Sequence, residues 1–333
     1  MNRRRTLATL VAFAAAHASG QVGARLTNRA SPYRIGLIPD LPPIRHAQIA
    51  EALRDLGWEA GSDYVLFQSG IPAGFEPERV VRRVLDGKPD LILAAVMGYI
   101  LIAHRLTHTT PIVMWATGYP VEAGVALSLA RPGKNVTGLA IYAGTEVFGK
   151  LLDLLRETKP DIRRIGVLWG YVPPFHPKEE IEPCYEELHS AASRLGVAMR
   201  IWEVARPEQT RPMLDAVAAE GVHAMLLTSG APMWPHREEI MRFATGMGLP
   251  TISDFTWPGV VPQPLLRYSP PPEVLLRQAA AYVDRILRMG VAPGELPIQR
   301  PAKFELEINL RTAKALGLEV PQSLLLRADK VTE

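Results

Sequence analysis

The sequence predicts an α/β protein built of two lobes, each a parallel sheet covered by helices on both faces. The expected strands are almost continuously apolar, which is typical of strands buried on both sides. Segments with helical spacing of apolar residues separate them. This alternation occurs twice along the chain, and a length of 333 residues favours two domains.

The first set of elements occupies roughly the first 130 residues. Apolar runs predict strands at 34–38, 63–67, 90–95 and 111–115, and helical spacing predicts helices at 49–57, 80–85, 99–106 and 121–129. Pro39 ends the first strand, and Gly57 stands where a helix commonly ends. These elements form one sheet and its covering helices.

The second set repeats the rhythm. Helices are expected at 147–155, 182–195, 211–219 and 240–245, and strands at 164–169, 197–204, 223–227 and 249–253. The proline-dense stretch 258–272 is expected to cross between lobes because proline restricts φ. A helix at 274–287 and an alternating strand at 304–310 follow. We therefore expect one lobe to comprise 32–142 plus 265–299, and the other 143–264 plus 300–333.

The first 18 residues have the three parts of a secretory signal peptide. Arg3, Arg4 and Arg5 are followed by an uncharged, mostly apolar segment from Leu7 to Ala16, and then by a small-x-small pattern ending at Ala18. Ten residues are too few to span a bilayer as a helix. We expect cleavage near Ala18, by the Sec or the twin-arginine route, and a periplasmic mature protein.

Charge argues against a nucleic-acid partner. The formal net charge is +3, but without the three N-terminal arginines 34 basic residues face 34 acidic ones. Nucleic-acid binding requires a clustered surplus of positive charge. We therefore expect no nucleic-acid partner.

Motifs for catalysis, cofactors and metals are missing. The sequence has no phosphate loop, no dinucleotide-binding glycine motif after a strand and no nucleophile elbow. The spacing of His104 and His108 would place them on one helix face, but no third ligand stands nearby in sequence. Cys184 is the single cysteine and has no partner for a disulfide. We expect no enzyme activity, no cofactor and no metal.

Several longer motifs are more specific. The segment Ser128 to Gly138 reads SLARPGKNVTG, the segment Lys303 to Leu318 reads KFELEINLRTAKALGL, and shorter matches lie at 150–155, 281–287 and 321–329. These segments resemble signatures of a family of ABC-transporter substrate-binding proteins related to those for tryptophan and tyrosine. With the strand rhythm, the resemblance covers nearly all of 32–333.

The resemblance implies two Rossmann-like lobes of the type I periplasmic-binding-protein kind, with a small ligand in an interlobe cleft that closes by hinge motion. We expect a monomer that delivers its ligand to an ABC permease in the inner membrane. Two alternatives stay open: a periplasmic sensing module that signals to a membrane receptor, and a secreted α/β enzyme.

The expected ligand site combines strand ends with the family motif. Tyr119 and Pro120 stand where the family has Asp-Pro, so a phenol replaces a carboxylate that would bind an ammonium group. We therefore expect an aromatic or apolar carboxylate or amide, selected by Tyr99 and Tyr119. The full expected set is Asp40, Met97, Gly98, Tyr99, Tyr119, Pro120, Asn135, Thr137, Trp169, Ser229, Asp254 and Tyr268.

Overall fold

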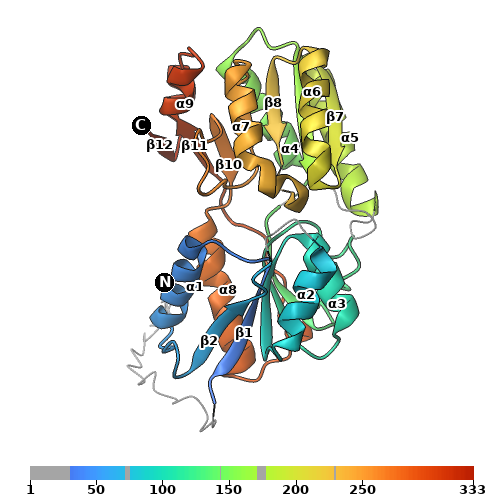
Figure 1. The fold of residues 1–333 in the computed structure, drawn as a ribbon, viewed down its shortest axis with the longest axis vertical. Coiled ribbons are helices and arrows are strands. Elements are labelled where there is room, and N and C mark those ends of the chain that lie inside the picture. The colour runs from blue at the N-terminus through green and yellow to red at the C-terminus, as the bar shows by residue number, and fades with distance from the viewer. Residues whose placement is uncertain (1–30, 72–75, 143, 171–177, 229) are drawn as a thin grey trace, which may run out of the picture. The chain divides into compact units, whose positions relative to one another are not determined.

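The computed structural model describes residues 31–71, 76–142, 144–170, 178–228 and 230–333. The expected signal peptide and Ser229 lie outside these residues. The described chain forms two sheets, one of five and one of seven strands, each covered by helices (Figure 1). The fold is of the expected class: two α/β lobes of the type I periplasmic-binding-protein kind. None of the described helices combines the length and apolarity needed to cross a membrane.

The five-stranded sheet is entirely parallel and has the order β2-β1-β3-β4-β5. Its strands are β1 (Tyr33–Ile38), β2 (Tyr64–Gln68), β3 (Leu91–Ala95), β4 (Ile112–Thr117) and β5 (Val136–Ala140). Helices α1 (Pro43–Asp55) and α8 (Pro272–Leu287) lie side by side, with α8 on the sheet, and α2 (Pro77–Asp86) and α3 (Met97–Leu106) pair elsewhere on it (Figure 1). Strands β3, β4 and β5 are buried along their whole length, as apolar runs between two helical layers require.

The seven-stranded sheet has the order β12-β11-β10-β9-β8-β6-β7. Its strands are β6 (Arg164–Gly170), β7 (Ala198–Val204), β8 (Ala224–Leu227), β9 (Thr251–Ser253), β10 (Leu266–Ser269), β11 (Glu305–Asn309) and β12 (Lys330–Thr332). All pairs are parallel except β10 with β11. The covering helices are α4 (Glu146–Thr158), α5 (Lys178–Leu195), α6 (Thr210–Glu220) and α7 (Arg237–Gly246), with short α9 (Leu310–Ala315) and α10 (Gln322–Leu325) near the end.

The chain passes between the two sheets three times. It leaves the first sheet after β5, returns from β10 to α8, and crosses again between Gln299, which bridges to Leu139, and β11. The residues 266–269 therefore belong to the seven-stranded sheet, whereas the expected boundary placed them in the other lobe. The proline-dense stretch is thus mostly a loop that leads into β10, and only its end crosses.

One expected helix is wrong. Residues 121–129 form successive turns instead. Gly124 has a φ of +74°, and the carbonyl of Pro120 accepts from both Val125 and Ala126, which closes a turn rather than a helical ladder. The turns lead into β5, a strand that the sequence analysis did not predict, as it did not predict β10 and β12.

Candidate functional site

In both sheets the order in which the chain adds strands reverses at an inner position. In the five-stranded sheet the chain order reverses between β1 and β3, and in the seven-stranded sheet between β6 and β8. Open α/β sheets bind ligands outside the carboxyl ends of their strands at such switch points. A site is therefore expected near the segments that follow β1 and β3 in one sheet and β6 and β8 in the other.

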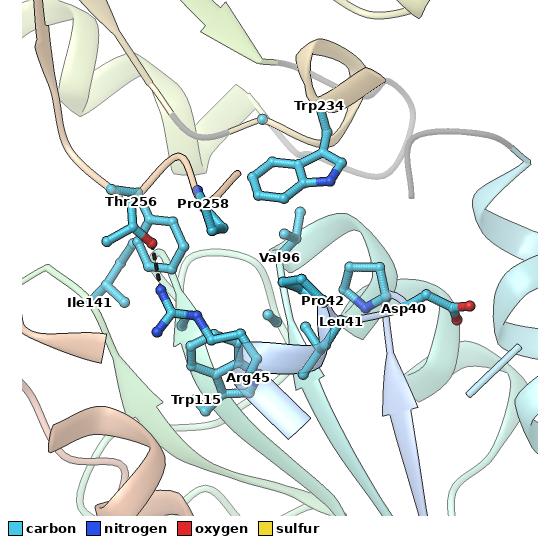
Figure 2. Close-up of a pocket in the computed structure, with 15 residues that line it drawn as sticks. Asp40, Leu41, Pro42, Arg45, Val96, Trp115, Ile141, Trp234, Thr256 and Pro258 are labelled. Carbon is cyan, nitrogen blue, oxygen red and sulfur yellow. Dashed lines mark hydrogen bonds between the residues drawn. The ribbon is translucent and has the colours of Figure 1, made fainter. Parts of the chain in front are cut away.

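A pocket, which we name the site cleft, lies at this position with a cavity volume of about 90 Å³ (Figure 2). One side is formed by residues that follow or end β1, β3, β4 and β5, and the other by residues that follow β8 and β9. Its lining residues are Pro39, Asp40, Leu41, Pro42, Arg45, Ala95, Val96, Trp115, Ala116, Ile141, Gly230, Trp234, Phe255, Thr256 and Pro258.

Aromatic and apolar side chains make most of this lining. Trp115 of β4 and Phe255 after β9 face each other from the two lobes with ring centroids 6.3 Å apart. Trp234 lies opposite Val96 and Pro42 in Figure 2, and the guanidinium carbon of Arg237 sits 5.0 Å from its ring centre. Such pairs bury large area at a low cost in side-chain entropy and suit an apolar or aromatic ligand.

Val96 carries backbone strain at the cleft. Its φ is +66°, a value that β-branched residues rarely adopt, and it precedes α3 at the carboxyl end of β3. Backbone strain of this kind costs about 1–3 kcal/mol and clusters at functional sites. The position therefore marks the turn after β3 as part of the site.

Arg45 places a buried positive charge at the cleft. Only 7% of Arg45 is exposed, and its guanidinium donates to Gln48 Oε1 over 2.6 Å and to Thr256 Oγ1 over 2.8 Å (Figure 2). Burial lowers the pKa of Arg45 below its ordinary value, and the charge of Glu273 offsets part of that effect. An arginine remains charged even so. Among the described residues, no carboxylate forms an ion pair with it.

A second pocket, the hinge pocket, adjoins the cleft and shares Val96, Ala116 and Ile141 with it. Its remaining lining residues are Met97, Thr117, Gly118, Tyr119, Tyr142, Trp169, Gly170, Ile181, Cys184 and Thr228. Five rings contact one another in series beside it, with neighbouring centroids 5.1–5.5 Å apart: Tyr119, Tyr142, Phe148, Trp169 and Tyr185. Tyr119 and Tyr142 are stacked, and the later pairs are tilted or edge-on. This series runs from the end of β4 through the crossing segment into the second core.

The expected site residues divide between three places. Asp40 lines the site cleft, whereas Met97, Tyr119 and Trp169 line the hinge pocket. The structure brings none of the others into either pocket, and Ser229 lies outside the described residues. Those others are Gly98, Tyr99, Pro120, Asn135, Thr137, Asp254 and Tyr268.

The expected selection by Tyr99 and Tyr119 needs correction. Tyr99 is 1% exposed and packs into the core of the first lobe, because α3 turns that face toward the sheet. Tyr119 stacks on Tyr142 and donates to the Gly144 carbonyl over 3.3 Å. Burial, followed by the neighbouring Cys184, raises the pKa of Tyr119 well above its usual range. The two phenols do not meet in one ligand site.

The motif residues Asn135 and Thr137 serve the fold. Asn135 Nδ2 donates to the carbonyls of Thr107 and Thr110 over 2.9 and 2.8 Å, and its Oδ1 lies 2.8 Å from His104 Nδ1. Thr137 donates to the carbonyl of Leu296 over 2.6 Å. Asn135 stands at the amino end of β5, the sheet edge opposite the cleft, so it cannot reach a ligand there.

Four further expected residues also have structural partners. Asp254 is 2% exposed and accepts from the Tyr142 hydroxyl over 2.7 Å, and Tyr268 of β10 stacks on Phe304 at 5.3 Å. Gly98 is buried within α3, and the Pro120 carbonyl caps the turn that replaces the expected helix. These positions shape the lobes and the crossing segment.

Asp40 is the one lining residue of the cleft that the sequence analysis named for the ligand site, and those it missed include Arg45, Trp115, Trp234, Phe255 and Thr256. A signal existed for Arg45, because it occupies the first position of the stripe that continues in Ile49, Ala52 and Leu53. A charge on an otherwise buried helix face requires a partner. Phe255 and Thr256 follow the expected strand at 249–253 and so stand at a carboxyl end.

Comparison with known proteins identifies the family of this chain. The model of the ABC transporter substrate binding protein family matches residues 44–226, which is more than half of the chain. The chain belongs to this family. Its members are substrate-binding proteins and not a family of enzymes.

Similar proteins agree with the family and the fold. A tyrosine-binding protein from Clostridioides difficile is 32% identical over 124 residues, a match that spans 36% of this chain and 34% of that protein. A domain protein from Vibrio cholerae has a TM-score of 0.75 at 22% identity, covering 91% of this chain and all of that one. A domain from Streptococcus pneumoniae, solved in complex with L-Trp, has a TM-score of 0.76 at 18% identity, covering 90% and 100%. The two structures establish the similarity of fold.

Proposed function

We propose that this chain is the exported solute-binding subunit of an ABC importer, which captures a small, largely apolar or aromatic solute in the site cleft and delivers it to a permease. The observation that carries the proposal is the cleft itself: aromatic walls from both lobes meet at the carboxyl ends of both sheets. The protein carries out no chemistry on the solute. The three-part pattern of the first 18 residues supports export to the periplasm.

Hinge closure follows from the same arrangement. A solute that contacts Trp115 on one lobe and Phe255 on the other binds best when both walls are near it, and so it favours the closed state. The three chain crossings supply the hinge. Membership of a family whose relatives include a tyrosine-binding protein supports a solute of the size of an aromatic amino acid.

Capture and uptake measurements test this function. The mature protein is purified, stripped of ligand, exposed to a periplasmic extract and analysed by native mass spectrometry for a bound solute. A strain lacking the chain is then expected to lose uptake of that solute. Phe255→Ala is expected to weaken binding about tenfold or more through loss of an aromatic wall, whereas Leu127→Ala, at a side chain 69% exposed, serves as the unaffected control. Absence of any captured solute, or normal uptake without the chain, contradicts the proposal.

A further inference from the structure

We propose that Arg45 is the residue that reads the ligand, and that the site cleft selects a monocarboxylate without an α-ammonium group; this inference rests on the proposed solute-binding function. Among the polar side chains of the described residues that line the cleft, hydrogen-bond donors outnumber acceptors. They comprise a buried arginine, two indole N–H groups, a hydroxyl and a single carboxylate.

The guanidinium of Arg45 has N–H donors that its two hydrogen bonds do not use. A guanidinium carries five N–H donors, and two bonds, to Gln48 and to Thr256, use part of them. Both acceptors are neutral, so the positive charge is buried without a counter-charge. Glu273 lies close enough to affect Arg45 electrostatically but is exposed and forms no ion pair with it. Arg267, the other charge that acts on Arg45, is paired with Glu307.

A buried charge is strongly destabilising unless an opposite charge pairs with it. A ligand carboxylate supplies the missing charge and fits the planar guanidinium, which binds carboxylates in a bidentate manner. The site is therefore incomplete until an anion enters it.

Two more groups of the cleft can donate to a ligand. Trp115 is 2% exposed, and its Nε1 has no hydrogen-bond partner among the described residues. The Thr256 hydroxyl accepts from Arg45, which leaves its own hydrogen available to donate. A buried donor without an acceptor is rare in folded proteins. Both donors favour a ligand that brings oxygen acceptors.

The described lining of the cleft offers no acidic partner to a ligand ammonium group. Asp40 is the one carboxylate among its described lining residues. Its Oδ1 accepts from the amide and hydroxyl of Ser69 over 2.9 and 2.7 Å, and its Oδ2 accepts from the Gly70 amide over 2.7 Å. In Figure 2 the carboxylate points away from Arg45 and Trp234. A ligand ammonium would enter an apolar, positively charged space without an acidic partner, which disfavours a zwitterion.

Four matched probes test the inference by calorimetry: 3-phenylpropionate, L-phenylalanine, 3-phenylpropanamide and phenethylamine. They share the ring and differ in charge. We expect wild type to bind 3-phenylpropionate at least tenfold more tightly than each of the others. We expect Arg45→Gln to lose about ten- to a hundredfold in affinity for the acid, with little change for the amide, as loss of a charge-assisted hydrogen bond predicts.

Control variants separate a loss of ligand recognition from a loss of folding. Arg54→Gln removes a charge from the exposed side of the same helix and is expected to keep the preference for the acid, whereas Arg45→Lys keeps part of it. Thermal unfolding of each variant shows that it is folded. Equal affinity of wild type for L-phenylalanine and 3-phenylpropionate, equal loss of acid and amide in Arg45→Gln, or binding of none of the four overturns the inference. The proposed function is tested separately: it is contradicted if the extract experiment captures no solute or if uptake is normal without the chain.

Discussion

Arg45 Nη2 donates a hydrogen bond to Thr256 Oγ1 over 2.8 Å, which joins α1 of the five-stranded lobe to the segment after β9 of the seven-stranded lobe (Figure 2). The bond lies beside the aromatic walls of the cleft, so the group that would meet a ligand carboxylate also links the lobes. Closing the lobes and pairing the charge of Arg45 therefore stabilise the same arrangement.

Thr256→Val is expected to weaken binding of 3-phenylpropionate by about tenfold, because it removes both the acceptor for Arg45 and a donor for the ligand. Titration calorimetry measures the change. Thr245→Val is the control, since the Thr245 hydroxyl is buried without a partner among the described residues and does not line the cleft. Equal affinities of wild type and Thr256→Val would rule out a role for this bond.

Tyr142→Phe is expected to lower the free energy of unfolding by about 1.5–3 kcal/mol, the typical value of a hydrogen bond to a charged group. The Tyr142 hydroxyl donates to Asp254, which is 2% exposed. Burial and the charge of Asp254 hold the pKa of Tyr142 well above its ordinary value, so the phenol stays protonated as the donor. Urea unfolding measures the effect. Tyr119→Phe, whose hydroxyl makes a longer bond to the Gly144 carbonyl, is expected to cost less than about 1 kcal/mol; a reversed order would contradict the assignment.

Gly138→Ala is expected to destabilise the protein by about 3 kcal/mol or more, because its φ is +124° and a Cβ there would collide with the backbone of Met114 in β4. Gly246→Ala is the matched control. No atom lies within 4 Å of the Cβ position at Gly246, its φ is not positive, and it ends α7, so stability is expected to be unchanged or slightly higher. Similar unfolding midpoints for the two variants would show that β4 and β5 are not packed as described.

Stability is expected to fall as the pH is lowered through about 6.5, the ordinary pKa of histidine. Burial lowers the pKa of His104 in the folded protein, although its bond to Asn135 opposes this. The unfolded chain therefore binds a proton at a higher pH than the folded chain does, so stability rises with pH across this window. Denaturant unfolding between pH 7.5 and 5.5 measures how steeply the free energy of unfolding changes with pH. His104→Gln is expected to reduce that slope. An unchanged slope in the variant would assign the effect elsewhere.

The sequence by itself determined the class of fold, the family and most strands and helices. Continuous apolar runs such as 90–95 and 111–115 carry their own signal, because a strand buried on both faces requires apolar residues at every position. The helix expected at 121–129 failed because Gly124 and the Pro120 carbonyl favour a turn, a local effect that apolar spacing does not reveal.

Only the tertiary structure decided which side chains line the site cleft. The motif around Asn135 and Thr137 is distinctive in sequence, yet its polar groups bind backbone carbonyls far along the chain. Arg45, by contrast, stands in a helix without a distinctive motif. Its place in the cleft depends on Thr256, which lies 211 residues away along the chain. Spacing along a chain specifies which residues share a face of a helix or strand. The partner that a face meets depends on how the lobes pack, and at Arg45 that packing leaves a charge buried without a counter-charge.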